Sequence, residues 1–165
     1  MKKILLISDT HSYLDARFVK HLESVDEVWH AGDIGDIVVC DKILKSCSEV
    51  NVVYGNIDNN IVRAEYQKDL FFNCEGVNVW MTHIGGYPPR YRDNIKQVIS
   101  EKKIDLFICG HSHILKVIYD KKIQCLHMNP GAAGQYGIHK VQTVLKFVVD
   151  QGAVKDLSIV ELERV

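Results

Sequence analysis

The chain has 165 residues, of which 47% are hydrophobic and 25% charged, and its formal net charge is −1. This length predicts a single domain over residues 1–165, and the composition is typical of a soluble globular protein rather than a disordered or fibrous one. The near-neutral charge argues against a surface built to coat nucleic acid, which would need a basic patch.

The five cysteines are odd in number and contain no CxxC pair. This pattern predicts buried free thiols rather than a disulfide framework or a thiolate zinc site. The apolar run after Met1 is too short for a signal peptide, and no other run approaches the ~20 residues that span a bilayer. We therefore expect a cytoplasmic protein without membrane association.

Strands and helices alternate through the first half of the chain. Apolar residues recur at helical spacing in some segments and form short continuous runs, typical of buried strands, in others. The expected elements are strands at 3–8, 27–30 and 49–54, helices at 14–24 and 38–46, and a hairpin of strands 70–74 and 77–81.

The second half is mainly β-structure. After a loop at 85–89, we expect a helix at 92–103 and strands at 104–109, 114–119, 123–127, 141–149 and 154–162. The order of these elements predicts an α/β fold in which two packed mixed β-sheets are flanked by helices, an α-β-β-α sandwich.

Five of the predicted strands end in polar residues that bind metals in proteins. One such residue is usually a turn former or a helix cap, but five strand ends of this kind are hard to explain as independent accidents. Ligands gather beyond the carboxyl ends of strands in α/β sheets, so we expect these side chains to form one site. The candidates are Asp9, His11, Asp33, Asn56, His83, His111 and His113.

Imidazole and carboxylate groups together suit Mn, Fe, Co, Ni or Zn, whereas Ca or Mg alone would favour oxygen ligands. Asp9 is separated from His11 by one residue, and His111 from His113 likewise. If these segments are extended, the alternation of side chains brings each pair to the same side and onto one site.

Five ordered motifs stand at these positions: DxH at Asp9–His11, GDxxD at Gly32–Asp36, GNxD at Gly55–Asp58, Thr82-His83, and GHxH at Gly110–His113. Together they resemble the motifs of the calcineurin-like metallophosphoesterases, and the match extends to Asn129-Pro130-Gly131. With no inserted cap, the chain looks most like the compact YfcE-type phosphodiesterases of that family. The resemblance implies the metallophosphoesterase fold.

The resemblance also implies a role for each candidate. One metal ion would be held by Asp9, His11 and His113, the other by Asn56, His83 and His111, and the carboxylate of Asp33 would bridge the two. The implied nucleophile is a hydroxide shared by the ions, with no further catalytic side chain. We expect two divalent ions, with Mn as the first choice and Fe, Ni, Co or Zn as alternatives.

Two further carboxylates, Asp36 and Asp58, lie in the motif loops. They could orient the metal ligands by hydrogen bonds without binding metal themselves, although capping or turn hydrogen bonds fit these positions equally well. His30 precedes the GDxxD motif, where a histidine satisfied by local hydrogen bonds is the simpler reading.

These features predict a dinuclear-metal-dependent phosphoesterase, specifically a phosphodiesterase acting on a small phosphoester. One alternative is a non-catalytic scaffold of the same fold, like the retromer subunit that has lost key ligands. Another is a phosphomonoesterase, because the ligands do not choose between esters. Fold analogy also allows a homo-oligomer.

The GNxD motif departs from the pattern of many family members, which carry a histidine at its third position. That histidine is assigned to protonating the leaving group and is oriented by the second Asp of GDxxD. Here the position is Ile57, which cannot donate a proton, so Asp36 lacks this partner. The YfcE-type members also lack the histidine.

Replacing Ile57 with histidine should therefore favour alkyl esters, whose leaving groups need a proton, over activated aryl esters. General acid catalysis contributes ~10²–10⁴-fold, so we expect kcat/KM to rise at least about tenfold for a methyl phosphodiester and less than about threefold for a p-nitrophenyl one. Equal gains on both esters would contradict this explanation of the departure.

Overall fold

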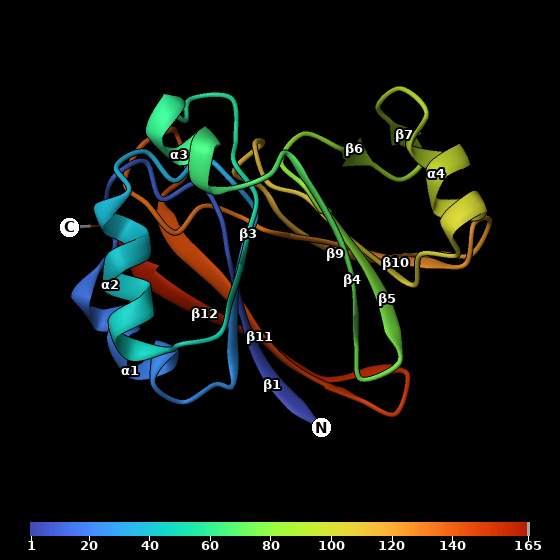
Figure 1. Ribbon diagram of the computed structural model, residues 1–165, viewed down its shortest axis with the longest axis horizontal. Helices are drawn as coiled ribbons and strands as arrows, with labels where there is room; N and C mark the ends of the chain where they lie inside the picture. The colour runs from blue at the N-terminus through green and yellow to red at the C-terminus, as the bar shows by residue number, and fades with distance from the viewer. Residues whose placement is uncertain (165) are drawn as a thin grey trace.

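The computed structural model describes residues 1–164 and places two five-stranded sheets face to face. The strand orders are β12-β11-β1-β2-β3 and β4-β5-β8-β10-β9. In Figure 1, α1 and α2 cover the outer side of the first sheet and α4 lies outside the second. The predicted sandwich of two mixed sheets flanked by helices is confirmed.

The first sheet contains β1 (Lys2–Ile7), β2 (Glu27–His30), β3 (Val50–Val52), β11 (Val141–Asp150) and β12 (Ala153–Glu163). The second contains β4 (Asp69–Cys74), β5 (Val77–Thr82), β8 (Leu106–Ile108), β9 (Leu115–Asp120) and β10 (Cys125–Pro130). A short hairpin is formed by β6 (Gly86–Tyr87) and β7 (Arg90–Tyr91). The helices are the 3₁₀ turn η1 (Ala16–Phe18), α1 (Val19–Leu22), α2 (Val38–Ser46), α3 (Asn60–Glu65) and α4 (Ile95–Lys102). None of the helices in residues 1–164 has the length and apolar character needed to cross a bilayer.

The parallel strands lie side by side in each sheet: at one end of the first sheet, where β3 forms the edge, and in the middle of the second. In the first sheet β1, β2 and β3 run parallel, and in the second β5, β8 and β10 do so. Antiparallel neighbours flank them: β11 beside β1, β4 beside β5, and β9 beside β10. The carboxyl ends of the parallel strands therefore lie together at one edge of each sheet.

Strand β1 is buried on both faces, which explains its continuous apolar run. Ile4 and Leu6 face the core between the sheets, whereas Leu5 and Ile7 face the layer of α1 and α2. Across the sandwich, the ring of Trp29 lies 5.0 Å from that of Phe72 in a T-shaped arrangement. This core holds the two sheets in a fixed relation.

Three segments differ from the sequence prediction. The helix expected at 14–24 is shorter, because Asp15 is extended and its side chain caps the turn that follows, while Asp26 already hydrogen-bonds to β1. The polar run after the GNxD motif contains α3, whose first turn is capped by the Asn59 side chain. The loop expected at 85–89 contributes to the β6–β7 hairpin.

Replacing Leu6 with alanine should lower the free energy of unfolding by about 2–5 kcal/mol, because it leaves a cavity in the core between the sheets. Leu157 on β12 is 40% exposed and provides the matched control. Its replacement by alanine should change stability by less than ~0.5 kcal/mol in the same urea titration. Equal losses from both variants would contradict this placement of the core.

Candidate metal centre

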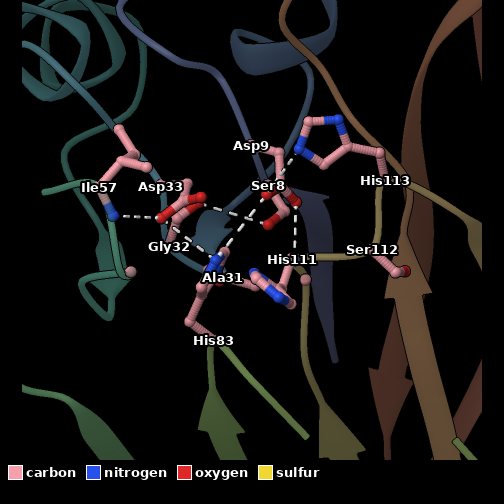
Figure 2. Close-up of polar contacts among 12 residues, drawn as sticks. Ser8, Asp9, Ala31, Gly32, Asp33, Ile57, His83, His111, Ser112 and His113 are labelled. Carbon is pink, nitrogen blue, oxygen red and sulfur yellow. Dashed lines mark hydrogen bonds and ion pairs between the residues drawn. The ribbon is translucent and has the colours of Figure 1, made fainter. Parts of the chain in front are cut away.

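The structure brings six of the seven candidate ligands together at the carboxyl ends of the parallel strands. Figure 2 shows five of them, all except His11. The six form two groups, and within each group the possible ligand atoms all lie within 4.8 Å of one another. The first group is Asp9, His11 and His113; the second is Asp33, His83 and His111. The seventh candidate, Asn56, follows β3 and lines the same cavity as His83.

Asp33 lies between the two groups. Its Oδ2 is 3.6 Å from Nε2 of His11 in the first group, and its Oδ1 is 3.2 Å from Nε2 of His83 in the second. Asp9 also faces histidines, with Oδ1 3.3 Å from Nε2 of His113. The carboxylate of Asp33 thus presents one oxygen atom to each group of candidate ligands.

Three buried polar atoms in these groups make no hydrogen bond within residues 1–164: Asp9 Oδ1, His11 Nε2 and His83 Nε2. Leaving buried polar atoms unpaired is costly, since each has lost its contacts with water. All three are atoms that coordinate cations, and the mixture of imidazole and carboxylate suits first-row divalent metals. The residues present therefore fit a pair of such ions.

Hydrogen bonds to backbone groups fix the orientation of the candidate ligands. His83 Nδ1 is 2.7 Å from the carbonyl oxygen of Ala31, so a proton on Nδ1 is donated there and Nε2 points toward the carboxylates. Asp9 Oδ2 accepts the amide of His111, and Asp33 Oδ1 accepts that of Ile57, both at 3.1 Å. One atom of each side chain is thereby held in place.

The electrostatics of the groups also favour a cation. Burial lowers the pKa of His11 and His111, which keeps their imidazoles neutral and able to coordinate. Burial opposes charge on His83 too, but Asp33 and Asp9 raise the pKa of this histidine above its ordinary value. The carboxylates that hold a proton on His83 would attract a metal ion in its place.

The backbone reaches these positions in a way that the sequence did not predict. The segments after β1 and β8 are not extended, so the expected alternation of side chains is wrong. Both pairs still converge on the site, with Asp9, His11 and His113 in the first group and His111 in the second. Five candidate ligands adopt the left-handed region, which is uncommon for non-glycine residues and recurs at functional sites: Asp9 (φ 54°), His11 (φ 45°), Asp33 (φ 54°), His111 (φ 69°) and His113 (φ 60°).

Two motif glycines are required because carboxylates pack against their backbones. A Cβ atom on Gly55 would lie 2.0 Å from Asp33 Oδ1, and one on Gly110 would lie 2.8 Å from Asp9 Oδ2. A side chain at either position would displace a candidate ligand. The glycines of GNxD and GHxH thus make room for the carboxylates of the other motifs.

The two motif-loop carboxylates do different things. Asp58 is buried and accepts the amide of Gly35 at 2.8 Å and that of Gly55 at 2.6 Å, so it joins the loops after β2 and β3. Asp36 is exposed and accepts the amide of Val38 at 3.0 Å, at the start of α2. Asp58 therefore joins two loops that carry candidate ligands, whereas Asp36 makes a turn hydrogen bond just before α2.

His30 and Asn129 complete the surroundings of the site. His30 accepts the amide of Gly32 at Nδ1, and its Nε2 lies 3.0 Å from Thr10 Oγ1; burial lowers its pKa to about 4, so it stays neutral. Asn129 donates to the carbonyl of Gly110 at 2.8 Å and holds the GHxH loop. From the sequence, Asn129 marked only the end of the family match; the predicted strand stopped at residue 127, whereas β10 includes Asn129.

Replacing Asp58 with asparagine should lower the free energy of unfolding by about 1–3 kcal/mol, because one amide would then face an NH₂ group instead of an acceptor. Asp36→Asn is the matched control, since asparagine also accepts the amide hydrogen bond of such an exposed turn, and it should cost less than ~0.5 kcal/mol. Urea denaturation measures both. A similar loss from the two variants would contradict the distinction between these carboxylates.

Comparisons with known proteins bear on the fold and the family of the chain. The chain is 32% identical over 165 residues to the "Probable metallophosphoesterase" of Mycoplasma pneumoniae, covering 96% of each protein. Its structure is similar to that of an archaeal phosphodiesterase, with a TM-score of 0.73, 19% identity and coverage of 97% of this chain and 99% of that one. It is also similar to wild-type Vps29 of Entamoeba histolytica complexed with Zn²⁺, with a TM-score of 0.70, 18% identity and coverage of 96% and 98%.

The sequence model of the calcineurin-like phosphoesterase superfamily domain matches residues 1–152. This match covers far more than half of the chain and includes all five motifs. The chain therefore belongs to the calcineurin-like phosphoesterase superfamily.

Proposed function

We propose that this protein is a phosphodiesterase that works with two divalent metal ions. Asp9, His11 and His113 would hold one ion, Asn56, His83 and His111 would hold the other, and Asp33 would be shared. The observation that carries the proposal is the position of Asp33, whose two carboxylate oxygens face His11 in one group and His83 in the other. Manganese is the proposed metal, with Fe, Ni, Co or Zn as substitutes of similar ligand preference.

Bound divalent ions supply Lewis acidity toward phosphate oxygens and lower the pKa of a water molecule that can attack phosphorus. The side chains of the protein contribute negative charge, neutral ligands and positioning. Asp9 and Asp33 bring negative charge that keeps two cations together, and neutral His11 and His111 add ligands without further charge. Asp58 joins the loop after β2 to the loop after β3 through hydrogen bonds to Gly35 and Gly55.

The side chain at position 57 bears on the choice of substrate. Ile57 is 45% exposed and lines a cavity with Asp36, so the place of a proton donor is taken by an apolar group open to solvent. A leaving group must then depart as an anion or take its proton from water. We therefore propose a preference for esters with acidic leaving groups.

A diester is favoured over a monoester because there is room beside the metal centre for a second substituent. A cavity of about 360 Å³ opens next to Asn56 and His83. We propose a small phosphodiester as the substrate and expect slower turnover of monoesters.

The similarity to Vps29 is a similarity of fold and leaves a scaffold role as the alternative. The buried ligand atoms of Asp9, His11 and His83, which make no hydrogen bond within residues 1–164, support a metal-dependent enzyme, because a role limited to scaffolding does not require them.

Replacing Asp33 with asparagine should remove both metal retention and turnover, since the shared carboxylate is lost. We expect fewer than two ions per chain by mass spectrometry and at least an about 100-fold lower kcat on bis(p-nitrophenyl) phosphate. Asp41→Asn on α2 should keep both properties. An Asp33→Asn protein with two retained ions and full activity would overturn the proposed sharing.

A further inference from the structure

A cavity with three positively charged side chains lies beside the metal centre. It has a volume of about 360 Å³ and is lined by Arg63, Lys68 and Arg92 as well as by Asn56 and His83. We call it the cationic cavity. Arg63 lies on α3, Lys68 lies between α3 and β4, and Arg92 follows β7, so segments at opposite sides of Figure 1 contribute to it.

The positive charge of the cationic cavity is largely uncompensated. Arg63 donates from Nε to the carbonyl of Asp58 at 2.7 Å and from Nη2 to that of Asn56 at 3.2 Å, so it is fixed by backbone groups that carry no formal charge. Within residues 1–164, Lys68 Nζ has no hydrogen bond and no ion pair.

Among the described residues, Asp93 is the single carboxylate in the lining. It lies 3.5 Å from Nε of Arg92, and both side chains are more than half exposed, at 57% for Arg92 and 78% for Asp93. An exposed pair of this kind is weak and can be displaced. The lining itself, with three cations and one carboxylate, therefore carries an excess of positive charge, separate from the carboxylates of the metal centre beside it.

We propose that the cationic cavity binds a second phosphate of the substrate, so that the preferred substrates are phosphodiesters carrying a further phosphate on the retained alcohol. This inference rests on the proposed function and adds the substrate class. With the scissile phosphate between the two ligand groups, the adjoining substituent would extend past Asn56 and His83 into the cavity. Guanidinium and ammonium groups are the usual partners of phosphate, and the volume suits a group of nucleotide size.

The test uses two substrates that differ only by the second phosphate: thymidine 5′-(p-nitrophenyl phosphate) with and without a 3′-phosphate. In both, water adds to the 5′ phosphorus and the bond to the aryl oxygen breaks. The products are p-nitrophenolate and either thymidine 3′,5′-bisphosphate or thymidine 5′-monophosphate. The quantity compared is the ratio of kcat/KM for the two substrates, measured on manganese-loaded protein.

The native protein should prefer the 3′-phosphorylated substrate, and Lys68→Met or Arg92→Gln should each reduce that preference about three- to tenfold. Lys42→Met on α2 is the matched control and should leave the ratio unchanged. A native protein without the preference, or a preference that survives both substitutions, would overturn the inference. A preference that survives both substitutions would instead mean that the extra phosphate chelates the metal ions.

A binding measurement separates this inference from the proposed function. Calorimetry compares thymidine 3′,5′-bisphosphate with thymidine 5′-monophosphate on the same proteins. If neither ester is hydrolysed, the proposed function fails, but a bisphosphate preference that is lost in Lys68→Met and Arg92→Gln still supports the cationic cavity. Equal binding of the two nucleotides would refute it.

Discussion

Two buried carboxylates, Asp9 and Asp33, face the ring nitrogens of histidines at 3.2 to 3.9 Å, and much of the local structure serves this arrangement. In the described part of the chain, histidines are their only ion-pair partners, so their charges are not neutralised by lysine or arginine. Concentrated, buried negative charge is unfavourable unless a cation offsets it. The chain brings these groups together by left-handed turns and by glycines, whose lack of a Cβ leaves room for the carboxylates.

The sandwich architecture explains why the ligand groups form where they do. Asp9 and His11 follow a strand of the first sheet, whereas their partner His113 follows a strand of the second; Asp33 and His83 are likewise drawn from different sheets. Each group therefore spans the interface between the sheets. Because ions bound to such groups would hold only the folded state together, metal binding and stability should be coupled.

Much of the fold was readable from sequence, since apolar periodicity fixed β2 and α2 at their observed bounds. The motifs predicted which side chains gather, because the carboxyl ends of parallel strands share one edge of a sheet and the two sheets pack with these edges together. The turn conformations could not be read, because positive φ angles at Asp9 or His113 depend on tertiary contacts rather than on local propensity. The cationic cavity could not be predicted from the sequence for a similar reason. Lys68 and Arg92 are far apart in the sequence, and only the fold brings them to one cavity.

The central claim is that two metal ions share the carboxylate of Asp33, and the electron paramagnetic resonance spectrum of protein loaded with two equivalents of Mn²⁺ tests it most directly. Ions held ~3.5–4 Å apart through a common ligand are magnetically coupled. The account predicts a broad, exchange-coupled spectrum at two ions per chain. Six-line signals from isolated Mn²⁺ at that stoichiometry, or saturation at one ion per chain, would contradict it.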